Sequence, residues 1–186
     1  MSYEFVGYHG TDSNCVASIQ EQGFALSKNP DDWLGCGVYF FAEGISEPIP
    51  NAIEWAKNQA YDSRTGSNKY ESYTVLEAAV TGVRVLNTTT NEGLKVYNVL
   101  RDALLEKHNK YFTKNRRFKD DDRIMWDLVA LNMSLDVVIH NLYIKNKMQR
   151  VKKICSNVPN TTVMCVKNSS LIDRNSVKEV AKGEVC

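Results

Sequence analysis

Apolar and small residues alternate at the start of the chain in a pattern typical of a strand. The run from Tyr3 to Tyr8 leads into His9-Gly10-Thr11, so we expect the strand to end there in a tight turn. Asp12 or Ser13 can cap a helix that follows, and Gln22-Gly23 supplies its end with a left-handed glycine. The N-terminal pattern therefore predicts strand, turn and short amphipathic helix.

The next stretch, NPDDWLGCGVYFF at 29–41, begins with turn residues and closes with β-branched and aromatic ones. This order predicts a loop that feeds a buried strand over 37–42, with Gly35 and Gly37 at its entrance. After a connection that contains two prolines, residues 51–61 have the apolar spacing of a helix.

The rest of the chain continues to mix the two periodicities. A strand is expected over 73–86, with a break near Gly82, and the polar run before it predicts a loop. We expect one helix over 91–107 and a second that begins at Asp120-Asp121-Asp122 and runs through Leu131. Two further strands are expected over 135–144 and 161–166. At 186 residues the chain has the length of one domain, which we assign to residues 1–186.

The composition indicates a folded globular protein, because 43% of residues are hydrophobic and 24% are charged. No apolar run approaches the roughly 18 residues that cross a bilayer, and the first ten residues do not resemble a secretion signal. We therefore expect a cytoplasmic protein with no membrane partner. Five cysteines without a CxxC pair and three scattered histidines argue against a metal site.

Charge is distributed unevenly along the chain. Residues 1–80 carry 4 basic and 11 acidic side chains, whereas residues 81–186 carry 19 basic and 11 acidic ones. The basic excess gathers in two stretches, 107–119 and 145–153. Such separation marks either a surface for a polar partner or two solvated faces.

Three residues point to a cleft for a flat ligand. His9 can bond a hydroxyl group, Gly10 lets the backbone approach a ligand closely, and Tyr39 can offer an aromatic face. The alternative is that each is a structural residue of a strand. The Gly35-Cys36-Gly37 run matches neither the dinucleotide fingerprint nor the phosphate loop, since both need further glycines.

The order of three short motifs adds to this interpretation. Tyr8-His9-Gly10-Thr11, then Gln22-Gly23-Phe24, then the segment WLGCGVYFF at 33–41 follow one another at short spacing. Together they resemble the ADP-ribosyltransferase superfamily, on its poly(ADP-ribose) polymerase-like, histidine-tyrosine branch. The resemblance covers residues 8–60 and is strongest with small bacterial and phage proteins of this kind.

The resemblance implies an α+β fold in which two bent antiparallel sheets with flanking helices form a cleft for NAD⁺ as co-substrate. His9 would bond a ribose hydroxyl, the Gly10 backbone would hold the carboxamide, and Tyr39 would stack on nicotinamide. Trp55 would form a second aromatic wall. The implied catalytic residues are His9 and Tyr39. The implied NAD⁺-binding residues are His9, Gly10, Thr11, Gly37, Tyr39, Phe40 and Trp55.

This chain departs from the branch at the position of its third motif. The strand over 161–166 contains no carboxylate, and Val163 falls where the family commonly has a glutamate. Polymer elongation must activate a sugar hydroxyl, so the missing carboxylate favours a single transfer. Glu77 can supply a carboxylate from another strand, or it is an ordinary strand residue.

The expected function is thus mono-ADP-ribosyl transfer from NAD⁺ to a protein or nucleic acid, in the setting of a toxin, a phage effector or anti-phage defence. An acceptor would dock through the basic residues from Lys107 to Lys119. Two alternatives remain open: a catalytically weak protein that binds NAD⁺ or ADP-ribose, and a nucleic-acid or protein interaction module that keeps the fold alone.

Overall fold

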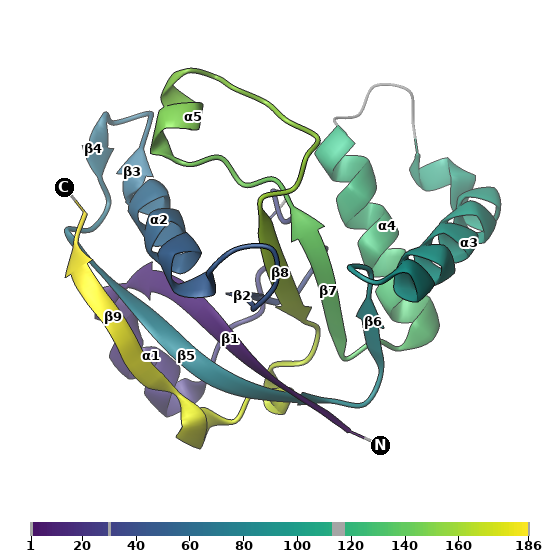
Figure 1. Ribbon diagram of the computed structural model, residues 1–186, viewed down its shortest axis with the longest axis horizontal. Coiled ribbons are helices and arrows are strands. Elements are labelled where there is room, and N and C mark those ends of the chain that lie inside the picture. Colours follow the sequence, from purple (N-terminus) through teal and green to yellow (C-terminus); the bar gives the residue numbers. More distant parts are fainter. Residues whose placement is uncertain (1, 30, 113–117, 186) are drawn as a thin grey trace.

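A mixed sheet of seven strands forms the centre of an α+β structure (Figure 1). The computed structural model describes residues 2–29, 31–112 and 118–185. The strands of the sheet lie in the order β6-β7-β8-β2-β1-β5-β9. The strands are β1 (Tyr3–Asp12), β2 (Val38–Phe41), β3 (Tyr61–Asp62), β4 (Ser67–Asn68), β5 (Ser72–Gly82), β6 (Val85–Asn87), β7 (Val137–Leu142), β8 (Thr161–Val166) and β9 (Lys178–Glu184). The α-helices are α1 (Val16–Gln22), α2 (Pro48–Ala60), α3 (Asn91–His108), α4 (Phe118–Met133) and α5 (Lys147–Val151). Single 3₁₀ turns are η1 (Ser13–Cys15), η2 (Asn109–Tyr111), η3 (Ser169–Leu171) and η4 (Arg174–Ser176).

The sheet differs from the two antiparallel sheets that the sequence suggested. It is continuous, and its β6–β7 pair is parallel, whereas the other pairs are antiparallel. Its two parts, β9-β5-β1 and β2-β8-β7-β6, are joined through the single pair of Tyr8 with Phe41. Figure 1 shows these parts running in different directions. The strands β1 and β2 therefore diverge beyond this pair and leave space between them.

The expected turn at His9 to Thr11 is wrong, because β1 continues through Asp12. These residues stay in the strand since they pair with the Tyr73–Leu76 segment of β5. The helix after them is confirmed. Asp12 accepts a hydrogen bond from the Asn14 backbone N–H at 3.0 Å, and Gly23, at φ 84°, ends α1.

Helices cover both faces of the sheet. On one face α2 buries Ala52, Ala56 and Ala60 completely, and on the other α1 buries Val16. The contact of α2 with β1 is so close that a Cβ atom on Gly10 would lie 2.1 Å from the Ala52 carbonyl oxygen. Gly10 is thus required for packing, and α2 is held directly over the C-terminal half of β1.

The helices α3 and α4 form a pair beside β6 and β7 (Figure 1). Tyr97 of α3 packs against Trp126 of α4 at a tilt of 31°, with 4.3 Å between ring centroids, and Trp126 also contacts His140 of β7. The predicted helices over 91–107 and 120–131 are therefore confirmed. No helix in the described part of the chain has the length and apolarity that a membrane span requires.

Candidate functional site

A cavity of about 480 Å³ opens where β1 and β2 diverge, in the size range of small-molecule sites. It is bounded by the C-terminal half of β1, the loop before β2, one side of α2 and the end of β7. All the residues that the sequence resemblance assigned to NAD⁺ line it: His9, Gly10, Thr11, Gly37, Tyr39, Phe40 and Trp55. The structure thus brings together residues that lie 46 positions apart in the sequence, from His9 to Trp55.

His9 is held in one tautomer by the backbone of β2. Its Nδ1 atom lies 2.8 Å from the carbonyl oxygen of Tyr39, and since a carbonyl only accepts, Nδ1 carries the proton. The ring packs edge-on against Phe24 and Phe40 at centroid distances of 5.2 and 5.8 Å. This burial lowers the pKa of His9, so the ring is neutral near pH 7 and Nε2 is its acceptor.

The Tyr39 hydroxyl is engaged by the loop before β2, and its one proton is not free for a ligand. The hydroxyl accepts from the Leu34 backbone N–H at 2.9 Å and donates to the Gly35 carbonyl at 2.6 Å. Burial raises the pKa of Tyr39 well above its usual value, so the group stays protonated. Tyr39 can therefore offer a ligand its ring, while its hydroxyl fixes the loop before β2.

The same loop is fastened by two further side chains. Lys167, at the end of β8, donates to the carbonyl oxygens of Leu34 and Cys36. Asp127 of α4 accepts from the Cys36 N–H at 2.7 Å. Gly35 adopts φ 76°, and a Cβ there would lie 2.0 Å from the Asp127 carboxylate. Side chains from β2, the end of β8 and α4 thus hold the loop in its shape.

The β1 edge of the cavity exposes strand backbone. Beyond Tyr8 no described residue of β2 pairs with β1, while β5 pairs with β1 along its other edge. The segment from His9 to Asp12 therefore has one edge without a strand partner, and it lies in the cavity wall. Backbone amide and carbonyl groups on such an edge can recognise an amide group of a ligand.

Aromatic rings line much of the cavity. Trp55 of α2 packs against Phe41 with 6.5 Å between centroids and remains partly exposed, as does Trp33 of the loop. Tyr70 closes another side, with its hydroxyl donating to the Ala56 carbonyl. Flat ligands can stack on such surfaces.

Val163 of β8 lines the cavity and is 3% exposed. The part of the wall where the family that the sequence resembles commonly has a glutamate is therefore apolar. Carboxylates come instead from Asp12, Asp31 and Asp32, which no sequence motif marked as site residues. Asp32 accepts from the Ser27 hydroxyl at 2.7 Å and the Asn29 N–H at 2.9 Å, and burial raises its pKa. Gln59, Lys69 and Tyr70 were also missed, because they reach the cavity from α2 and from the connection before β5.

The other sequence candidates lie elsewhere. Glu77 is not among the lining residues and forms an ion pair with Lys178, 2.8 Å between Oε1 and Nζ. No described residue of α3 or α4 lines the cavity. Of the acceptor stretch Lys107–Lys119, residues 113–117 lie outside the described residues, so its role stays a prediction.

In comparisons with known proteins, no family model matches the chain, and no curated protein matches its sequence. Within the described ranges, no three His, Cys, Asp or Glu side chains lie together as a metal site requires.

Proposed function

We propose that the protein is a mono-ADP-ribosyltransferase that binds NAD⁺ in the cavity between β1 and β2. The observation that supports this most strongly is the convergence of the His9 and Tyr39 motifs on one cavity. Both motifs were selected from the sequence for NAD⁺, and Trp55 joins them from α2. A set of structural residues scattered through the core would not need to share a cavity.

The lining offers groups suited to three parts of NAD⁺: the nicotinamide ring, a phosphate and a ribose hydroxyl. A nicotinamide ring is flat and carries a positive charge, which suits the rings of Tyr39 and Trp55 and the nearby carboxylate of Asp32. Lys69 is the basic residue of the lining and can approach a phosphate. His9 Nε2 is an acceptor and can receive a hydrogen bond from a ribose hydroxyl.

Transfer would proceed by displacement at the nicotinamide-bearing ribose carbon. The bond from this carbon to the ring nitrogen breaks, and its electron pair leaves with nicotinamide. The protein holds the sugar through His9 while fixed carboxylates stabilise the developing positive charge. With Val163 in place of a glutamate, β8 carries no carboxylate that could activate a sugar hydroxyl, which favours one transfer over chain growth.

Binding of NAD⁺ or ADP-ribose without transfer is the second candidate. It is favoured by the same apolar wall at Val163, since the cavity can hold a nucleotide without a catalytic carboxylate on β8.

Calorimetric titration with NAD⁺ tests the binding step that both candidates share. We expect saturable binding to the wild type and a weaker complex with His9→Asn. The matched control is His140→Asn, because His140 is also partly buried, bonds Thr88 through Nδ1 at 2.8 Å and does not line the cavity. The proposal would be wrong if both variants lost affinity for NAD⁺ equally, or if the wild type did not bind NAD⁺ at all.

A further inference from the structure

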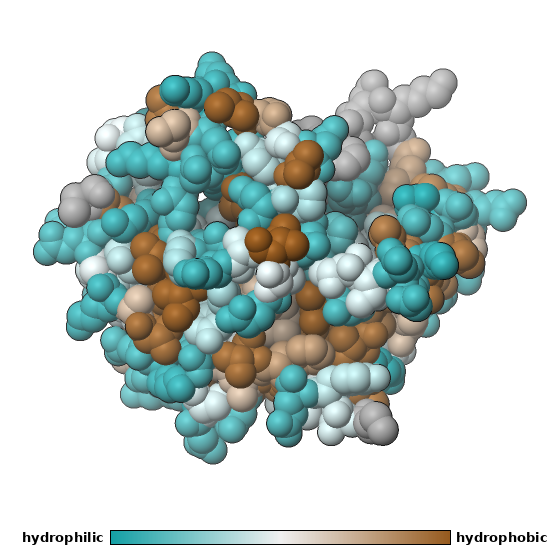
Figure 2. Space-filling model, in the orientation of Figure 1, coloured by the Kyte–Doolittle hydropathy of each residue, from teal (hydrophilic) through white to brown (hydrophobic). Residues whose placement is uncertain are grey.

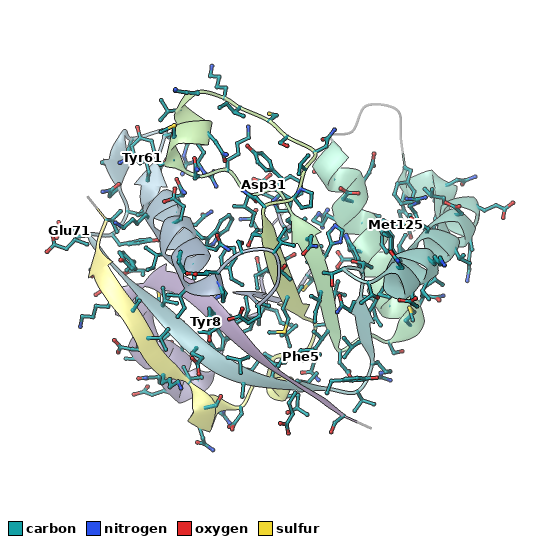
Figure 3. All side chains as sticks on the ribbon, viewed as in Figure 1. Phe5, Tyr8, Asp31, Tyr61, Glu71 and Met125 are labelled. Atoms are coloured by element: carbon teal, nitrogen blue, oxygen red, sulfur yellow. The ribbon has the colours of Figure 1, made fainter. Side chains whose placement is uncertain are left out.

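The connection between β7 and β8 forms one rim of the cavity. We call residues 143–160 the basic arm; it carries the short helix α5. Leu142, the last residue of β7, and Ile144, at the start of the arm, both line the cavity. In Figure 1 the arm extends above α2 and β8, and Figure 3 places Asp31 below it.

The arm is fastened near the cavity by several hydrogen bonds. The Lys147 backbone N–H donates to Glu54 Oε1 at 2.5 Å, and Glu54 precedes the cavity residue Trp55. Ile144 and Asn160, at the two ends of the arm, exchange hydrogen bonds of 2.9 and 3.0 Å. A ligand that binds the arm is therefore brought to the cavity mouth.

The arm is basic and contains no acidic residue. Its basic residues are Lys145, Lys147, Arg150, Lys152 and Lys153. Lys147, Lys152 and Lys153 are exposed, and none forms an ion pair with another described residue. Like charges gathered in this way repel one another, and a polyanion relieves that repulsion.

The chemistry of the arm favours phosphates over a protein face. Lysine is depleted in protein–protein interfaces, whereas most contacts to nucleic acids go from Lys, Arg and small polar groups to the backbone phosphates. Met148 and Val151 are 65% and 75% exposed beside these cations. Figure 2 shows such hydrophobic residues among hydrophilic ones over α5, and apolar side chains can contact the methyl group of thymine.

We propose that the basic arm docks a nucleic-acid strand as the acceptor of the transfer, which rests on the function proposed above. A nucleophilic nitrogen or oxygen of the strand bonds to the ribose carbon of NAD⁺ as the bond to nicotinamide breaks. Nicotinamide leaves with the electron pair, and the proton of the nucleophile goes to solvent. The arm supplies proximity, which is the main requirement for such a step.

The docking is tested without NAD⁺, so that its failure is separate from failure of the proposed function. Fluorescence anisotropy with single-stranded oligothymidylate and oligouridylate measures binding as the salt concentration rises. The arm variant Lys147→Gln/Lys152→Gln/Lys153→Gln is compared with a control of equal charge, Lys95→Gln/Arg174→Gln/Lys182→Gln on α3, η4 and β9. All six side chains are exposed, so both variants should keep the wild-type melting temperature.

We expect the wild type to bind, with an affinity that falls steeply with salt. The arm variant should bind about tenfold or more weakly and lose about 2 units of salt slope, near 0.7 for each lost phosphate contact. The control should stay within about twofold of the wild type. With NAD⁺ added, mass spectrometry should find ADP-ribose on an oligonucleotide, and the two probes distinguish DNA from RNA.

Absence of binding by the wild type at low salt would overturn the proposal. So would an equal loss in the control, or binding without any transfer by a protein that turns over NAD⁺. Binding to phosphatidylserine vesicles or to an acidic protein in place of both oligonucleotides would assign the arm to another partner and overturn it as well.

Discussion

The Nδ1 atom of His9 lies 2.8 Å from the backbone carbonyl oxygen of Tyr39. This contact joins β1 to β2 through a side chain, just beyond the single pair of Tyr8 with Phe41. It bridges the two strands where they diverge around the cavity, and it fixes which nitrogen of His9 can accept. Of the two residues expected to be catalytic, one therefore positions the other: the backbone of Tyr39 orients the ring of His9.

His9→Asn separates this structural bond from ligand binding. The Asn side-chain amide can still donate to the Tyr39 carbonyl, but the Nε2 acceptor is lost. We expect NAD⁺ affinity to fall by about 1–3 kcal/mol, the cost of one hydrogen bond to a buried partner. Calorimetry measures the affinity and thermal unfolding measures the stability. An unchanged affinity with a much lower melting temperature would make His9 a packing residue.

The pH dependence of stability should also report on His9. Burial lowers the pKa of His9 below the ordinary histidine value of about 6.5, so the unfolded chain takes up a proton at a higher pH than the folded protein does. The free energy of unfolding therefore falls as pH drops through about 6.5, and continues to fall until the folded pKa is reached. His140, with its pKa lowered in the same direction, contributes likewise.

Urea denaturation of the wild type and His9→Asn, from about pH 5 to pH 8, isolates this contribution. The difference in stability between the two proteins should shrink as the pH falls. Asp122, whose pKa burial raises to about 6, titrates in both proteins and cancels. A difference that is constant with pH would contradict a neutral His9.

Tyr39→Phe removes the hydroxyl that holds the loop before β2 and keeps the ring. The Leu34 N–H and the Gly35 carbonyl lose their partner, so we expect stability to fall by about 1–3 kcal/mol. NAD⁺ should bind Tyr39→Phe more tightly than Tyr39→Leu, which lacks the aromatic face. Equal affinities of the two variants would rule out stacking on Tyr39.

Lys167→Met tests the fastening of the same loop. The substitution leaves two carbonyl oxygens, of Leu34 and Cys36, without their donor, and we expect a loss of about 2–3 kcal/mol in stability. Lys178→Met is the matched control, because its ion pair with Glu77 is 64% exposed on the lysine side and such pairs contribute about 0–1 kcal/mol. Equal effects in chemical denaturation would show that Lys167 does not brace the loop.

The elements predicted correctly are those whose signal is local. Asp12 and Gly23 mark the two ends of the first helical segment within the sequence itself, and the Val38–Phe41 strand follows from its β-branched and aromatic residues. The strand β9 was missed because KEVAKGE is a partly exposed sheet edge with little apolar alternation. The continuation of β1 past His9 was missed because it depends on pairing with β5, about 65 residues away.

In the site, too, the residues predicted correctly are those marked by their neighbours in the sequence. His9, Gly10 and Tyr39 stand in motifs that can be read from neighbouring residues. Lys69 joins the cavity only through the path of the chain, and nothing in the residues around it indicates a shared site. The two aspartates of the NPDDW turn were the available signal, since carboxylates in a loop before a motif strand can reach a ligand.

Release of nicotinamide from NAD⁺, followed together with labelling of macromolecules in a cell extract, tests the central claim most directly. The account predicts that the wild type releases nicotinamide and attaches single ADP-ribose units to an acceptor, that His9→Asn does neither at a comparable rate, and that His140→Asn behaves as the wild type. Wild-type protein that binds no NAD⁺ and labels nothing, or labelling that persists unchanged in His9→Asn, would contradict it.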